Sequence, residues 1–117
     1  MEYSRGVFEC NPDTREMRHV WKRPVCHAQS NGDRTLFCGD QTPYAWHLQP
    51  LELLFFNRKT QQEKHIVTAM PKPAIPRGDY HLDPHPHFSP DGRYIIYMTT
   101  VLGHIDVAVT PVEPLLK

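Results

Sequence analysis

Two stretches of the chain follow one scheme, and this repeat restricts the fold more than any other feature of the sequence. The stretches are CHAQSNGDRTLFCGD, which begins at Cys26, and PHFSPDGRYIIYMTT, which begins at Pro86. Each contains a histidine, a short strand-forming run, a turn with Asp and Gly, and then a β-rich run. They are offset by about 60 residues, and strand-and-turn repeats of roughly 40 to 60 residues indicate the blades of a β-propeller.

Turn residues divide the rest of the chain into short strands. Asn, Asp, Gly and Pro favour tight turns, and runs of β-branched and aromatic residues between them favour strands. We therefore expect a hairpin between Tyr3 and Trp21, a hairpin turn at Asn31-Gly32-Asp33, strands at Leu51–Asn57 and Lys64–Ala69, a turn at Pro90-Asp91-Gly92, and strands at Arg93–Thr99 and within His104–Glu113.

The composition agrees with an all-β, turn-rich chain. Hydrophobic residues make up 39% of the 117 residues, 12 residues are proline, and the mean hydropathy is −0.55. We predict a partial β-propeller of about two blades, each a four-stranded antiparallel sheet, divided into residues 1–24 (a partial blade), 25–76 and 77–117. Because a propeller closes with about four to eight blades, we expect further blades, supplied either by a longer protein or by other copies of the chain.

Charge and cysteine content exclude several classes of partner. Lys plus Arg and Asp plus Glu number 13 each, so no net charge attracts nucleic acid or an anionic membrane. The three cysteines have no CxxC spacing, which disfavours both a disulfide framework and a zinc knuckle. No stretch approaches the roughly 20 apolar residues of a membrane span, and the first residues do not resemble a signal peptide. We therefore expect a cytoplasmic protein.

The histidines are the candidate metal ligands. In an extended strand the side chains of His81, Asp83, His85 and His87 would point to one face. His27 occupies the corresponding position in the preceding repeat, so neighbouring blades can present imidazoles to one ion. Three roles are open to Asp83: binding the ion directly, orienting a histidine through its other ring nitrogen, or capping a turn. We favour the orienting role. The alternative is that these histidines form structural hydrogen bonds to loops, as in propellers that contain FSPDG.

The chain resembles a known family. The segments HAQSN, HPH and DVAVTPVE, within a likeness that runs from about Val25 to Glu113, are similar to the C-terminal blades of the oligogalacturonate lyases. This resemblance implies a seven-bladed propeller that depends on a divalent ion of the manganese type. It also implies a uronate oligosaccharide, oligogalacturonate, as the substrate, and β-elimination in pectin breakdown as the reaction.

The resemblance also implies a ligand set. His27, His85 and His87 match the family's histidine ligands, whereas Leu82 stands where the family has a glutamine ligand. His81 or Asp83 is expected to replace that glutamine. The family's catalytic histidine base and a nearby arginine are expected upstream of Met1, so we assign no catalytic residue in this chain.

Two other functions remain open at this point. One is a non-catalytic propeller of the TolB kind, which binds a protein or glycan and uses its histidines structurally. The other is a lyase for a different uronate-containing glycan, because Leu82 marks a divergent site.

Overall fold

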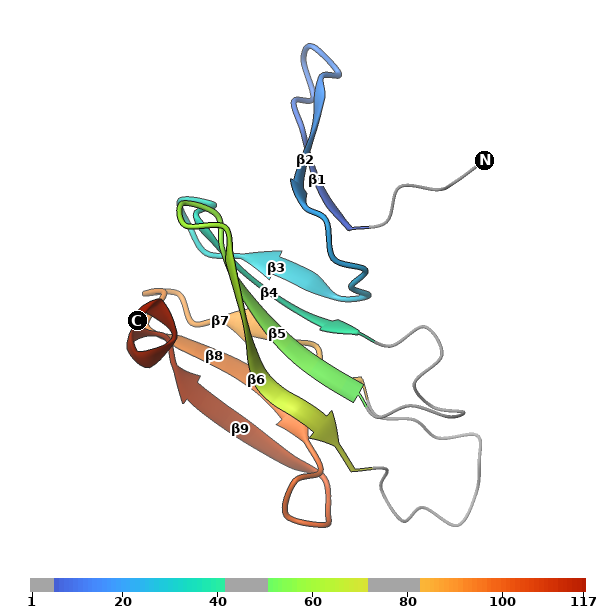
Figure 1. Cartoon of the computed structure of the whole chain (residues 1–117), viewed down its shortest axis with the longest axis vertical. Coiled ribbons are helices and arrows are strands. Elements are labelled where there is room, and N and C mark those ends of the chain that lie inside the picture. Colours follow the sequence, from blue (N-terminus) through green and yellow to red (C-terminus); the bar gives the residue numbers. More distant parts are fainter. Residues whose placement is uncertain (1–5, 42–50, 72–82) are drawn as a thin grey trace.

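The computed structural model of the chain describes residues 6–41, 51–71 and 83–117. These residues form β-strands and one short 3-10 helix (Figure 1). The strands are β1 (Val7–Cys10), β2 (Met17–Trp21), β3 (Ala28–Ser30), β4 (Leu36–Gln41), β5 (Leu51–Asn57), β6 (Gln62–Met70), β7 (His87–Phe88), β8 (Tyr94–Thr99) and β9 (Asp106–Pro111), and the 3-10 helix is η1 (Glu113–Leu116).

The strands form three antiparallel sheets of strands that follow one another in the sequence. The N-terminal sheet is β1-β2, the central sheet is β3-β4-β5-β6, and the C-terminal sheet is β7-β8-β9. The prediction of an all-β chain of antiparallel sheets is confirmed. The central sheet has the four strands expected of a blade, and the described part of the C-terminal sheet has three.

The central sheet is covered on both faces, and its strand β5 shows why. Successive side chains of a strand point to opposite faces. Leu53 and Phe55 join one core with Ile95 of the C-terminal sheet, whereas Leu54 and Phe56 join a second core that includes residues of the N-terminal sheet. A strand buried on both faces needs an unbroken apolar run, which the four residues LLFF (Leu53 to Phe56) supply. The three sheets therefore stack face to face, as neighbouring blades do.

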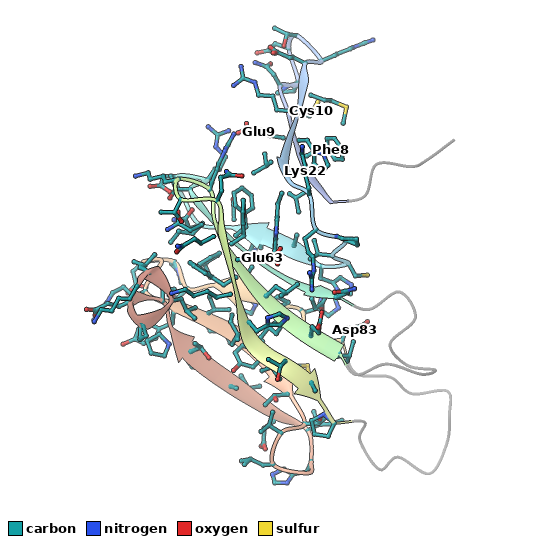
Figure 2. All side chains as sticks on the ribbon, in the orientation of Figure 1. Phe8, Glu9, Cys10, Lys22, Glu63 and Asp83 are labelled. Atoms are coloured by element: carbon teal, nitrogen blue, oxygen red, sulfur yellow. The ribbon has the colours of Figure 1, made fainter. Side chains whose placement is uncertain are left out.

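The N-terminal sheet is held to the central sheet by polar contacts at its margin. The Trp21 indole Nε1 donates a hydrogen bond to Glu63 at 2.7 Å, and the Trp21 ring stacks on Phe56 with centroids 5.2 Å apart. Glu9 projects from β1 toward the turn between β5 and β6 (Figure 2), where Arg58 donates a hydrogen bond to its carboxylate at 3.0 Å. The Arg58 guanidinium lowers the pKa of Glu9.

Two features bear on the class of protein. All three cysteines are free thiols, and only Cys38 is buried. Within the described ranges, no helix has the length and apolar character needed to cross a membrane.

The short strands β3 and β7 bring the two repeated segments together. β3 contacts β7 although they belong to different sheets. His27 stands just before β3, His85 lies two residues before β7, and His87 begins β7, so these three histidines lie near this junction. The candidate site is therefore formed between the central and C-terminal sheets.

Candidate metal centre

His27 is held at the junction by the extension of the β3–β4 ladder. The amide of Cys26 donates to the carbonyl of Asp40 at 2.7 Å, and the amide of Asp40 donates to the carbonyl of His27 at 3.2 Å. These two bonds continue the pairing of β3 with β4 beyond Ala28. The backbone of His27 is therefore fixed opposite Asp40.

Asp40 is a wholly buried carboxylate, and its oxygens contact His27 and His85. Its Oδ1 accepts the backbone N–H of His27 at 2.8 Å, and its oxygens lie 3.0 and 3.1 Å from His27 Nδ1. Its Oδ2 accepts the backbone N–H of His85 at 3.2 Å. Because a buried carboxylate is costly unless its oxygens are satisfied, these N–H donors explain how Asp40 is tolerated in the interior.

His85 lies in a segment that prolines keep out of a β-ladder. Asp83 to Pro86 form no strand, and β7 begins only at His87. The expectation of one extended strand with its polar side chains on one face is therefore wrong for this part. Pro84 and Pro86 have no N–H to donate to a neighbouring strand. His85 itself has a φ of +45°, in the left-handed region that non-glycine residues rarely adopt.

The segment is nevertheless firmly attached. Pro84 is fully buried, and its carbonyl accepts the N–H of Met98 at 2.9 Å, beside the hydrogen bond from His85 to Asp40. A residue in a sparsely populated backbone conformation persists only where its surroundings hold it there, and such residues cluster at functional sites. The surroundings here are β4 on one side and β8 on the other.

The imidazoles of His27 and His85 come together. Their ring centroids are 3.7 Å apart and the ring planes are inclined by 33°. Ligand atoms of His27, His85 and Asp83 all lie within 4.8 Å of one another. Asp83 Oδ2 is 3.9 Å from His85 Nε2, and Figure 2 shows Asp83 at the edge of the molecule where β5 begins.

This donor set fits a divalent transition metal. Protein nitrogen and oxygen ligands lie about 2.0–2.2 Å from such an ion, so two ligand atoms of one ion are at most about 4.4 Å apart, which is close to the 4.8 Å within which these atoms lie. Two imidazoles and a carboxylate suit metals such as manganese, iron or zinc. His27, Asp83 and His85 are therefore the described residues best placed to hold an ion.

A second grouping shares His27 with this site. Ligand atoms of Cys26, His27 and Asp40 also lie within 4.8 Å of one another. Here, however, the Asp40 carboxylate already accepts N–H donors from His27 and His85. We therefore take His27, His85 and Asp83 as the candidate ligand group.

The other predicted residues are placed as follows. His87 is exposed at the start of β7, and its Nδ1 lies 3.3 Å from the carbonyl of His85, outside the group of ligand atoms described above. Its assignment as a ligand stays a prediction. His81 and Leu82 lie outside the described residues. Asp83 lies among the potential ligands, in addition to the orienting role expected for it.

Asp40 is the site residue that the sequence did not reveal. It stands at the end of the run LFCGD, where an acidic residue is usually the solvated end of a strand. The only sequence signal for Asp40 is that it follows the apolar residues Leu36 to Cys38 in one strand. That signal does not indicate which histidines its carboxylate would face.

Comparisons with known proteins show which proteins this chain is similar to. The chain is 30% identical over 112 residues to the oligogalacturonate lyase of Dickeya dadantii and 30% identical over 111 residues to the oligogalacturonide lyase of Pectobacterium atrosepticum. Each match covers 86% of this chain and 29% of the relative, so the chain spans less than a third of the length of these relatives. No protein-family profile matches the chain.

Solved structures agree with these relatives. An oligogalacturonate lyase in complex with manganese superposes with a TM-score of 0.72 and 26% identity, over 94% of this chain and 29% of that one. The fold of an oligogalacturonate lyase from Vibrio parahaemolyticus superposes with a TM-score of 0.66 and 24% identity, over 87% of this chain and 27% of that one. The predicted resemblance and the predicted partial propeller are both confirmed.

Proposed function

Since this chain is related in sequence and in fold to a segment of the oligogalacturonate lyases, we propose that it forms the metal-binding part of a lyase that cleaves oligogalacturonates by β-elimination. The observation that carries the proposal is the convergence of His27, His85 and Asp83 from two neighbouring sheets. The manganese complex of a structural relative supports a divalent ion, with Mn²⁺ as the first candidate.

The proposed reaction removes a proton from a uronate and expels the sugar linked to it. The C5–H bond breaks and its proton passes to a base, a C4=C5 double bond forms, and the C4–O bond to the leaving sugar breaks, its oxygen taking up a proton from water to become a hydroxyl. A divalent ion, when bound, would supply a Lewis acid that makes the C5 proton of the uronate more acidic. His27, His85 and Asp83 would hold that ion at the junction of the two sheets.

The described residues would contribute the metal site. We assign the general base that removes the C5 proton to propeller blades outside the described residues. A positioned general base contributes about 10²–10⁴ in rate, so a chain without that base is expected to bind the ion but to turn over little substrate. This is why we propose metal binding for the chain alone and elimination for the assembled protein.

The outer faces of the stack support the proposal that further blades belong to the working protein. On the C-terminal sheet the side chains of Val107 and Val109 are 69% and 56% exposed, and on the N-terminal sheet Met17 is 62% exposed. Apolar side chains that alternate along an edge strand need a partner face, which a neighbouring blade provides in a propeller. These faces are where we expect further blades, from a longer protein or from other copies.

The test measures metal content and product separately. Purified chain is dialysed with Mn²⁺ and analysed for bound metal beside His85→Ala and the control His104→Ala, whose imidazole is 69% exposed, pairs with Asp106 and belongs to neither group of potential ligands. We expect the native chain and His104→Ala to keep the ion and His85→Ala to lose it. Absorbance of the unsaturated uronate product, with oligogalacturonate and added Mn²⁺, is expected to show little turnover by the chain alone.

Three results would contradict the proposal. Metal absent from all three proteins, or retained equally by His85→Ala, would remove the metal centre and favour a non-catalytic propeller module. A preparation that contains the remaining blades and binds Mn²⁺, yet forms product only from another uronate glycan, would replace oligogalacturonate as the substrate.

A further inference from the structure

We propose that Asp40 is the positioning residue of this site: its carboxylate sets which nitrogen of His27 carries a proton and holds the backbone of His85, so that the two imidazoles face one ion. The inference rests on the proposed metal centre. It concerns a residue of β4 that is wholly buried and that contacts both histidines through N–H donors.

The contact between Asp40 and His27 determines the tautomer of His27. A carboxylate offers only acceptors, and a neutral imidazole has one N–H. Because His27 Nδ1 lies 3.0 and 3.1 Å from the two oxygens of Asp40, the N–H is placed on Nδ1. The lone pair is then on Nε2, and Nε2 is the nitrogen available to an ion.

The contact between Asp40 and His85 determines the position of the second imidazole. Within Pro84-His85-Pro86 the amide of His85 is the one backbone donor, because proline has none. This amide donates a hydrogen bond to Asp40 Oδ2 at 3.2 Å. The backbone of His85 has the uncommon φ of +45°. A hydrogen bond from β4 therefore fixes a residue that no strand holds.

Asp83 is less well placed for this positioning role. Its side chain is 23% exposed, and its Oδ2 lies 3.9 Å from His85 Nε2, which is longer than a hydrogen bond. Asp40 has no exposed surface and contacts His27 and His85 together. The two carboxylate oxygens of Asp40 accept the backbone N–H groups of His27 and His85, and they thereby orient both candidate ligands.

The test substitutes Asp40→Asn in the full chain, with Asp106→Asn as the control. Asn keeps the size of the side chain and one oxygen, but its amide group opposes an N–H on His27. Second-shell partners of metal ligands are typically worth about 10–100-fold in affinity. We expect Asp40→Asn to weaken Mn²⁺ binding about 10–100-fold by titration calorimetry. Asp106 pairs with His104 at 2.9 Å and belongs to neither group of potential ligands, so Asp106→Asn is expected to bind Mn²⁺ as the native chain does.

A second measurement needs no metal and no active enzyme. The ¹⁵N shifts of the His27 imidazole, read in the metal-free native chain, are expected to show the Nδ1–H tautomer. In Asp40→Asn the population is expected to move toward the Nε2–H tautomer. A role that is only structural would change stability without moving this tautomer balance.

The outcomes separate this inference from the proposed function. A native chain that binds Mn²⁺ together with an Asp40→Asn variant that is folded and binds equally tightly would overturn the role of Asp40 and leave the metal centre intact. An Nε2–H tautomer for His27 in the native chain would also overturn it, even if Asp40→Asn does not fold. A native chain that binds no Mn²⁺ would overturn both.

Discussion

Gln29 and Phe88 join the two repeats: the side-chain Oε1 of Gln29 in β3 accepts the backbone N–H of Phe88 in β7 at 2.9 Å. β7 has only two residues and pairs with β8 at only two positions. The hydrogen bond from Phe88 to Gln29 therefore adds a contact that holds β7 against β3. Gln29 lies two residues after His27, and Phe88 lies three after His85. The contact between Gln29 and Phe88 therefore helps to set the distance between His27 and His85, and it also holds the central and C-terminal sheets together.

Substitution of Gln29→Leu is expected to destabilise the chain. Leu keeps much of the side-chain volume but leaves the amide of Phe88 without its acceptor, and an unsatisfied buried donor costs about 1–3 kcal/mol. Urea denaturation followed by circular dichroism measures the loss. Gln62→Leu is the control, because Gln62 is exposed at the start of β6. Equal stability of the two variants would show that the Gln29 bond does not hold the repeats together.

The two faces of the C-terminal sheet are expected to respond differently to truncation. Ile95 has no exposed surface and belongs to the core shared with Leu53 and Phe55, whereas Val109, on the adjacent strand, is 56% exposed. Ile95→Ala is expected to cost about 2–5 kcal/mol because it leaves a cavity. Val109→Ala is expected to change stability by about 0.5 kcal/mol or less. Urea denaturation of both variants measures the difference, and a larger loss in Val109→Ala would reverse the assignment of the core face.

Most of the strands could be predicted from local signals because their causes are local. The side chain of Asn31 accepts the amides of Thr35 and Leu36, which makes the turn between β3 and β4 a property of the sequence SNGDRT itself. The predicted strand at Leu51–Asn57 is β5 residue for residue, and Lys64–Ala69 lies within β6. Each of these elements depends on a turn or an apolar run that a reader finds in one stretch of chain.

The site was harder to predict because it depends on contacts between distant segments. Spacing alone placed the polar side chains from His81 to His87 on one strand face, but Pro84 and Pro86 prevent a ladder there and His85 adopts a positive φ. Asp40 showed no pattern of its own, since its function comes from facing His27 and His85 across a sheet boundary. The histidines could be named from the repeat, whereas the carboxylate that orients them required the packing of β4 against the segment before β7.

Cys38 is expected to make the stability of the chain depend on pH in the alkaline range. Burial raises the pKa of its thiol from 9.0 to about 12, with a smaller contribution from Asp40. In the unfolded chain the thiol ionises above about pH 9, while in the folded chain it stays neutral, so its contribution to stability is full below pH 9 and is lost as the pH rises toward 12. Urea denaturation at pH 8 and pH 10.5 measures the loss of stability, and Cys38→Val, which keeps an apolar side chain but has no thiol, is expected to show a smaller loss.

The exposed thiols of Cys10 and Cys26 are expected to react with iodoacetamide in the folded chain at pH 8, while the thiol of Cys38 does not. Rapid labelling of Cys38, or the same pH dependence in Cys38→Val as in the native chain, would show that the thiol is not shielded between the central and C-terminal sheets.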